Sequence, residues 1–153
     1  MSKAGTNGFT LVELLVVLAL AAMLMAVTPP LISAALPGVE LKAAARRTAA
    51  SLRLAREQAI RSGQATVWQL NIASGDYHLE PGDGRSRRLP SGLELSLVTT
   101  EREQIDDERG GIRFFADGTS SGGRVVLARG ERGFQVGVHW LTGRVLIADW
   151  ERQ

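Results

Sequence analysis

The chain has 153 residues, with 18 Lys and Arg, 16 Asp and Glu, and no Cys. This length suits one domain, or a smaller one with an appendage, and a net charge of +2 is too small to indicate a nucleic-acid or lipid-headgroup partner. Without Cys, disulfides, thiolate metal sites and a Cys nucleophile are excluded. The mean hydropathy of +0.01 averages two unlike parts, because residues 9–36 hold 22 apolar residues and one charge. The pattern predicts a membrane-seeking N-terminal segment attached to a water-soluble domain.

The apolar segment is long enough to cross a bilayer. Residues 14–27 are apolar without interruption, and residues 9–27 span roughly 28 Å as a helix. One interpretation is a secretory signal peptide cut near the small residues at 33–35, although it has only Lys3 as a basic residue and two prolines before the cut. A single-span anchor is the second. Neither explains Glu13, because a carboxylate costs about 2.5–3.5 kcal/mol at the centre of a membrane helix and less near its ends.

A third interpretation accounts for Glu13. Residues 8–15 read GFTLVELL and resemble the class III signal of type IV pilins and type II secretion pseudopilins. The resemblance implies that prepilin peptidase cleaves between Gly8 and Phe9 and methylates the new Phe9 amine, so that residues 1–8 are a leader peptide and the apolar segment is retained. It also implies that Glu13, the fifth mature residue, neutralises the N-terminal amine of a neighbouring subunit in a filament.

The flanking charges favour the opposite membrane orientation. Lys42, Arg46 and Arg47 follow the apolar segment and Lys3 alone precedes it, whereas the more basic flank ordinarily stays in the cytoplasm. The resemblance nevertheless implies a cytoplasmic N-terminus. It therefore implies a single-pass protein of the bacterial inner membrane whose C-terminal domain lies in the periplasm.

A second helical segment follows Pro37 and Gly38, which punctuate the first. Over residues 39–62 the apolar residues recur at helical spacing and share one face: Leu41, Ala45, Ala49, Leu52, Ala55 and Ala59. Gly63 is a natural stop. We expect residues 9–36 to form the transmembrane or filament-core helix, and residues 37–63 to continue it into the soluble domain with the alanine-rich face against a sheet.

From residue 64 onward the apolar period changes to two, which is typical of strands. Short strands are predicted at 65–71, 77–80, 93–98, 112–115, 124–129, 133–140 and 144–150, separated by glycine-containing turns. One long helix followed by short strands favours an α+β fold, with antiparallel sheets in a β-rich domain over 64–153. In the last hairpin, closed by Thr142 and Gly143, the apolar residues of the two strands alternate: Phe134, Val136 and Val138, then Val145 and Ile147.

The C-terminal half carries a second resemblance. Residues 114–123 read FFADGTSSGG, followed by VVL at 125–127 and LTGRV at 141–145, which is similar to H-type minor pseudopilins of the GspH/FimT family. The resemblance implies a pilin-like fold and a structural protein near the tip of the type II secretion pseudopilus, not an enzyme. We expect no cofactor and no metal. The implied partners are other pseudopilins, prepilin peptidase and the inner-membrane assembly platform, and contact with secreted proteins is compatible with it.

Residues able to carry chemistry have structural interpretations. His78 and His139 lie in predicted strands with no carboxylate at a metal-binding spacing, and Ser120 and Ser121 are not part of a nucleophile elbow. The glycines at 118–123 lack the lysine of a phosphate loop. Trp68, Trp140 and Trp150 are expected in the core or at its rim. No catalytic constellation emerges.

Two charged groups remain. The first is the acidic cluster Glu101, Glu103, Asp106, Asp107 and Glu108, which lacks the spacing and central glycine of a calcium loop. We expect the stretch 99–111 to be a mobile or partner-facing loop. The second group is Arg85, Arg87 and Arg88, also expected in a solvated loop.

Two other functions compete with secretion. The first is a minor pilin that primes a type IV pilus or takes up DNA. DNA-binding minor pilins carry a Gly-Arg-x-Arg pattern near the C-terminus, and this chain has Leu146 where the second arginine would stand after Arg144. Because affinity for phosphates needs several cationic contacts, a nucleic-acid partner is not expected. The second is a secreted enzyme behind an ordinary signal peptide.

Overall fold

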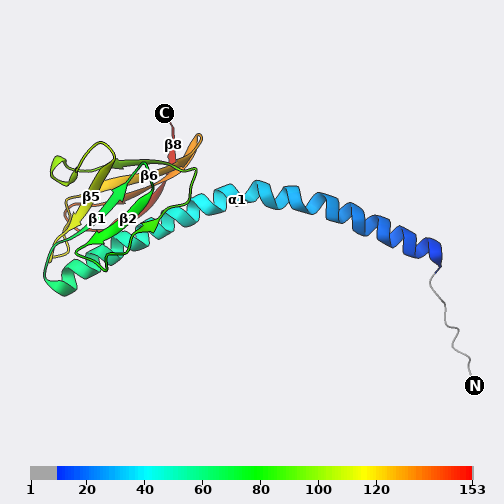
Figure 1. Ribbon diagram of the computed structural model, residues 1–153, viewed down its shortest axis with the longest axis horizontal. Coiled ribbons are helices and arrows are strands. Elements are labelled where there is room, and N and C mark those ends of the chain that lie inside the picture. Colours follow the sequence, from blue (N-terminus) through cyan, green and yellow to red (C-terminus); the bar gives the residue numbers. More distant parts are fainter. Residues whose placement is uncertain (1–9, 153) are drawn as a thin grey trace, which may run out of the picture. The chain divides into compact units, whose positions relative to one another are not determined.

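The computed structural model describes residues 10–152, except for the side chains of residues 26–37. The chain divides into two compact units, Met1–Pro37 and Gly38–Gln153. Its elements are, in chain order, α1 (Leu11–Ser62), β1 (Thr66–Asn71), β2 (Asp76–Glu80), β3 (Arg87–Arg88), β4 (Glu94–Val98), the 3₁₀ turn η1 (Glu101–Glu103), β5 (Arg109–Phe114), β6 (Gly123–Arg129), β7 (Arg132–Val138) and β8 (Val145–Glu151) (Figure 1).

The first unit contains the N-terminal part of α1. Thr10 caps the helix, because its Oγ1 accepts a hydrogen bond of 3.2 Å from the Glu13 backbone N–H. All side chains from residue 10 to residue 25 are exposed. In the part of the chain that the structure describes, no helix is both long and apolar enough to cross a membrane. The expected leader, Phe9 and the side chains of residues 26–36 lie outside the described residues.

Residues 38–62 of α1 form the spine of the second unit. The six residues predicted for the alanine-rich face are all at most 6% exposed, which confirms that face. Thr48 and Ser51 share it, and their hydroxyls donate to the carbonyl oxygens of Ala44 (3.1 Å) and Thr48 (2.8 Å). The helix ends at Ser62, and Gly63 follows with a φ of 66°, the left-handed conformation that ends many helices.

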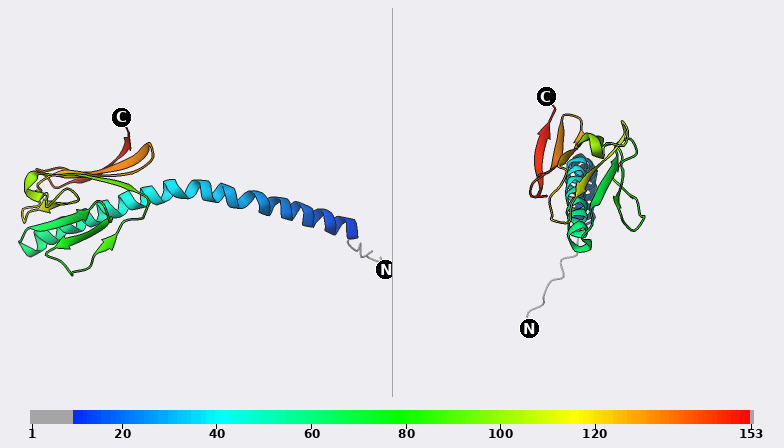
Figure 2. Two further views of the ribbon diagram at one scale, coloured as in Figure 1. Left: turned by 45° about the horizontal axis from the view of Figure 1, so that its top comes forward. Right: turned by 90° about the vertical axis from the view of Figure 1, so that its left-hand side faces the viewer.

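Two antiparallel sheets flank this helical segment. One has the strand order β3-β2-β1-β5 and the other β4-β6-β7-β8. In the end-on view they lie on opposite sides of the helix (Figure 2). The α+β fold with a long N-terminal helix on antiparallel sheets is therefore confirmed.

The core is shared by the helix and both sheets. From the first sheet, Trp68 is fully buried, and its indole N–H donates to Ser51 Oγ at 2.9 Å. The rings of Trp68 and Tyr77 lie 5.6 Å apart. From the second sheet come the inward-facing residues Val125, Leu127, Val136, Val138 and Val145. The small side chains of α1 let both sheets approach the helix closely.

Several boundaries differ from prediction. Strand β5 begins at Arg109, three residues earlier than expected, and β7 ends at Val138, two residues earlier. Strand β3 was not predicted. Of the alternating apolar residues in the last hairpin, Ile147 in the edge strand β8 is 38% exposed.

The stretch 99–111, expected to be a mobile or partner-facing loop, has more secondary structure than predicted. It contains η1 and the start of β5, and residues Gln104 and Gly110 form a bridge. The Thr99 hydroxyl donates to the Gly111 carbonyl at 2.5 Å. The acidic composition does not show the ion pairs with Arg109 and Arg113 that hold this stretch.

Candidate assembly sites

Glu13 is the sequence-predicted assembly residue that the structure describes. Its side chain is exposed, and among the described side chains, those of residues 10–25 and 38–152, none forms an ion pair or hydrogen bond with its carboxylate. Its neighbours Leu11, Val12 and Leu14 are at least 57% exposed. An apolar surface that carries one carboxylate needs a cationic partner once it is withdrawn from water. The other predicted residues, Gly8 and Phe9, lie outside the described residues.

Two segments of the C-terminal half, residues 114–123 and 141–145, contact the same arginine of α1, Arg56. Arg56 Nε donates a hydrogen bond of 2.9 Å to the Gly118 carbonyl oxygen. Gly143, in the turn between β7 and β8, packs against the same pair: a Cβ there would lie 2.2 Å from Gly118 O and 2.6 Å from Arg56 Nε. Both glycines have positive φ, 82° and 61°. The two segments therefore pack closely against each other and against α1.

The turn around Gly118 is held by hydrogen bonds from short side chains. Thr119 donates to Asp117 from its hydroxyl (2.6 Å) and its N–H (2.9 Å), and these hydrogen bonds lower the pKa of the Asp117 carboxyl. Ser120 and Ser121 accept hydrogen bonds from the N–H groups of Gly122 and Arg113, each at 3.0 Å. Both hydroxyls therefore have structural roles, as the sequence suggested.

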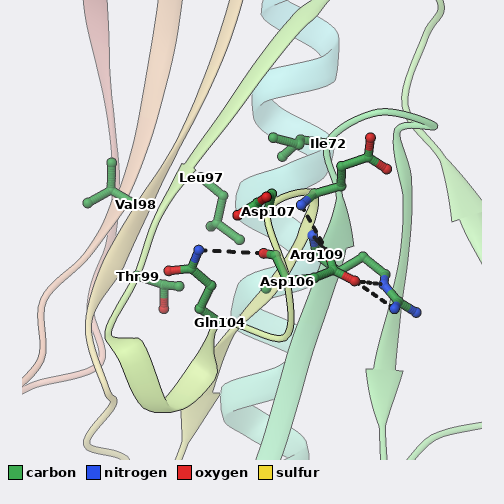
Figure 3. A pocket seen from close by; sticks show the side chains of 10 residues that line it. Ile72, Leu97, Val98, Thr99, Gln104, Asp106, Asp107 and Arg109 are labelled. Carbon is green, nitrogen blue, oxygen red and sulfur yellow. Dashed lines mark hydrogen bonds and ion pairs between the residues drawn. The ribbon is translucent and has the colours of Figure 1, made fainter.

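The acidic cluster borders a hollow of about 260 Å³ between β4 and the loop that leads into β5 (Figure 3). Asp106 accepts from Arg109 Nε (2.7 Å) and from the N–H groups of Glu108 (3.0 Å) and Arg109 (2.7 Å). The hydrogen bond from the Arg109 side chain, first among these causes, lowers the pKa of the Asp106 carboxyl. One carboxylate of the acidic cluster, Asp106, is therefore already paired with Arg109.

A second carboxylate of the cluster is almost fully buried. Glu103 is 9% exposed and forms a two-pronged pair with Arg113, at 2.6 Å from Nε and 3.1 Å from Nη2. This pair ties η1 to β5. Within residues 10–152, outside the side chains of 26–37, no group of three or more His, Asp or Glu side chains could hold a metal ion.

The arginines expected in a solvated loop are also paired. Arg88 lies in β3 and contacts Asp76 at 2.7 Å; this hydrogen bond lowers the pKa of the Asp76 carboxyl. Arg85 and Arg87 lie 4.0 and 3.9 Å from Asp83.

The candidate aromatic residues occupy different environments. Trp68 is in the core and Trp150 is half-buried, but Trp140 is 62% exposed, so it was misplaced by prediction. His139 stacks on Trp140 at 6.3 Å, and its Nδ1 lies 3.3 Å from the Thr142 hydroxyl. His78 lies opposite Gln69 in the β1–β2 register.

Sequence reasoning did not identify Arg56. The available signal was a charged residue directly after Ala55, at the border of the alanine-rich face, where a long side chain can reach the rim of a sheet. Its partner, a backbone carbonyl, has no sequence signature.

A long N-terminal helix whose second half is packed between antiparallel sheets defines a pilin-like α+β protein. The fold matches the minor pseudopilin EpsH from the type II secretion system of Vibrio cholerae, with a TM-score of 0.55, 17% identity, and coverage of 71% of this chain and 96% of that one. At this identity the match shows the fold alone.

The sequence comparisons are more specific. Residues 44–142 match the family model for type II transport protein GspH, and residues 3–28 match the prokaryotic N-terminal methylation motif. Type II secretion system protein H of Xanthomonas campestris pv. campestris is 34% identical over 139 residues, which are 91% of this chain and 81% of that protein. The chain belongs to the GspH family of type II transport proteins.

Proposed function

We propose that this chain is a minor pseudopilin of a type II secretion system. The observation that carries the proposal is the 34% identity to type II secretion system protein H over 91% of the chain. The methylation motif at residues 3–28 supports it, as does the pilin-like fold. The family implies assembly with other pseudopilins and anchoring at the inner membrane, and the chain acts there as a structural component and not as an enzyme.

Its N-terminus is made by processing. Prepilin peptidase cleaves between Gly8 and Phe9, removes the leader 1–8 and methylates the Phe9 amine. Gly8 has no side chain to obstruct a protease. The apolar residues 9–36 then anchor the subunit as a single span, with residues 37–63 and the β-rich domain 64–153 in the periplasm.

In the filament the same apolar helix changes its surroundings from lipid to neighbouring helices. Its exposed side chains at residues 10–25 are available for such packing. Glu13 neutralises the Phe9 amine of an adjacent subunit, which removes two desolvated charges at once. The assembly platform of the inner membrane inserts the subunit near the tip of a short pseudopilus, where its outer surface meets other pseudopilins and secreted proteins.

Mass spectrometry of the mature N-terminus tests the processing. We expect N-methyl-Phe9 as the first residue, whereas a mature chain that begins near Leu36 would indicate a secretory signal peptide.

A secretion assay tests the function. Deletion of the gene is expected to leave folded secretion substrates in the periplasm, with pilus formation and DNA uptake unchanged. Loss of pili with normal secretion would favour the minor-pilin alternative.

A further inference from the structure

The positive charge of the second unit is concentrated on its helix. Residues 38–62 contain six basic and two acidic residues, whereas residues 63–153 contain eleven basic and thirteen acidic ones. The small net charge of the chain therefore conceals a segregation between a positive helix and a negative set of strands and loops. Local charge, and not net charge, decides what such a surface attracts.

Three of these basic residues lie together where the segment begins. Lys42, Arg46 and Arg47 are all exposed and lie within about 7.5 Å along the helix axis. Lys42 and Arg46 are one turn apart on the same side, and Arg47 flanks them. We call these three residues the basic cluster.

The basic cluster has no carboxylate partner among the described residues, since the ion pairs there involve other arginines. Glu40, the nearest acidic residue of the segment, is engaged by Arg129 at 3.2 Å. Glu57 follows Arg47 by ten residues, or about 15 Å of helix. Elsewhere in the unit, by contrast, Arg88 and Arg113 each contact a carboxylate at 2.7 Å or less. The cluster is therefore available to an external anion.

We propose that the basic cluster binds the phosphates of anionic phospholipids at the membrane surface while the subunit waits to be assembled. This rests on the proposed function, because it needs the apolar segment to lie in a bilayer. Lys42 follows Leu36 by six residues, which reach at most about 21 Å even when extended. As helical residues of α1 they rise only about 9 Å. The cluster therefore follows closely on the apolar segment, which favours lipid over an acidic protein surface.

The physical basis is the surface potential of an anionic leaflet. It attracts each nearby Lys or Arg and decays within a Debye length of about 8 Å at physiological salt. Val39, on the same side of the helix and 65% exposed, adds an apolar contact at the interface. The contact also explains why the more basic flank follows the apolar segment. The basic cluster binds lipid on that side of the membrane.

The test uses the full chain, which has no Cys, so that a single introduced thiol can be labelled. Ala50 is exposed one turn beyond Arg46 and Arg47, and Ala50→Cys carries a fluorophore. The protein is reconstituted into vesicles of phosphatidylcholine, alone or with about one third phosphatidylglycerol, that contain a headgroup-spin-labelled quencher. We expect roughly twofold stronger quenching in the anionic vesicles, reduced by high salt.

Two triple variants, each of which removes three positive charges, test whether the basic cluster causes the dependence on anionic lipid. Lys42→Gln/Arg46→Gln/Arg47→Gln should lose the dependence on anionic lipid. Arg124→Gln/Arg132→Gln/Arg144→Gln, which neutralises three exposed arginines of the second sheet and its last turn, should retain it. Equal quenching in both lipids, or the same response in both variants, overturns the inference. Loss of a crosslink to another pseudopilin in the cluster variant, without lipid dependence, assigns the cluster to a protein partner and also overturns it. Failure of the full chain to float with vesicles counts against the proposed anchoring itself.

Discussion

Arg56 Nε, on α1, donates a hydrogen bond of 2.9 Å to the carbonyl oxygen of Gly118, 62 residues further along the chain. The bond joins the helix to the turn between β5 and β6. Gly143, from the turn between β7 and β8, closes over both groups. One helix side chain therefore sets the position of two turns of the C-terminal half.

The fit at Gly143 predicts a large effect of a single methyl group. Gly143→Ala would place Cβ 2.2 Å from Gly118 O at a φ of 61°. We expect the free energy of unfolding to fall by roughly 2–5 kcal/mol, from overpacking and left-handed strain together. The measurement is urea unfolding in detergent, followed by tryptophan fluorescence, to which the buried Trp68 contributes. Gly130→Ala is the control, because Gly130 has a φ of 65° and open space around it; it should cost only about 1–2 kcal/mol. Equal losses would contradict the packing argument.

The buried hydrogen bond between Trp68 and Ser51 predicts a second effect. Ser51→Ala removes the acceptor of the indole N–H, which is fully buried and has no access to water. An unsatisfied donor of this kind costs about 1–3 kcal/mol, and the same unfolding measurement applies. Ser86→Ala, at an exposed position, should change the free energy of unfolding by less than about 0.5 kcal/mol. A Ser51→Ala variant as stable as the parent would show that the bond contributes nothing.

The sequence predicts those features of the fold that depend on residues close together in the chain, and it misses those that depend on distant partners. The buried face of α1 is encoded by the spacing of its own alanines, and the stop at Gly63 by one residue, so both were predictable. Most strands were predicted to within a few residues. Strand β3 was not, because Arg87 and Arg88 carry no strand pattern and are held by pairing with β2 and by Asp76.

The acidic loop shows the same limit for the candidate site. Its composition predicts a solvated segment, but two of its carboxylates are paired with Arg109 and Arg113, and the partner of Glu103 lies ten residues away. Local composition does not report such pairings. The roles of Gly8, Phe9 and Glu13, by contrast, are predicted from one short motif within residues 8–13, and that prediction does not depend on tertiary contacts.

The pairing of Glu103 predicts a local change. Glu103→Gln keeps the shape but removes the charge that faces Arg113, which costs about 1–2 kcal/mol because the arginine is partly exposed and screened. We expect amide hydrogens of residues 101–108 to exchange about tenfold faster, with the helix unaffected. Glu101→Gln, at an exposed position of the same turn, should leave exchange unchanged. Unaltered exchange in the Glu103 variant would mean that the ion pair does not hold the loop.

The lowered pKa values of Asp76, Asp106 and Asp117 predict an acid limit to stability. Each carboxyl is held charged in the folded protein by hydrogen bonds, chiefly from Arg88, Arg109 and Thr119 respectively. Their stabilisation is present above the ordinary aspartate pKa, near 4, and is lost as the pH falls below it. We expect the melting temperature to drop as the pH falls below about 4, and Asp76→Asn/Asp106→Asn to reduce the slope there. An unchanged slope would contradict the assignment.

Glu13 gives the sharpest prediction for assembly. Its carboxylate is exposed in an apolar surface, and the proposed partner is the Phe9 amine of a neighbouring subunit. Glu13→Val should be cleaved, methylated and inserted normally, because the peptidase acts before any subunit contact. It should fail to enter filaments, since the neighbour's amine is left desolvated and unpaired at a cost of about 3–5 kcal/mol. The measurement is recovery of the chain in sheared pseudopili, with N-terminal mass spectrometry of the membrane pool. Glu57→Val, which removes an exposed carboxylate from the second unit, should assemble as the parent does. Normal incorporation of Glu13→Val would refute the role, whereas loss of processing would place Glu13 in recognition by the peptidase.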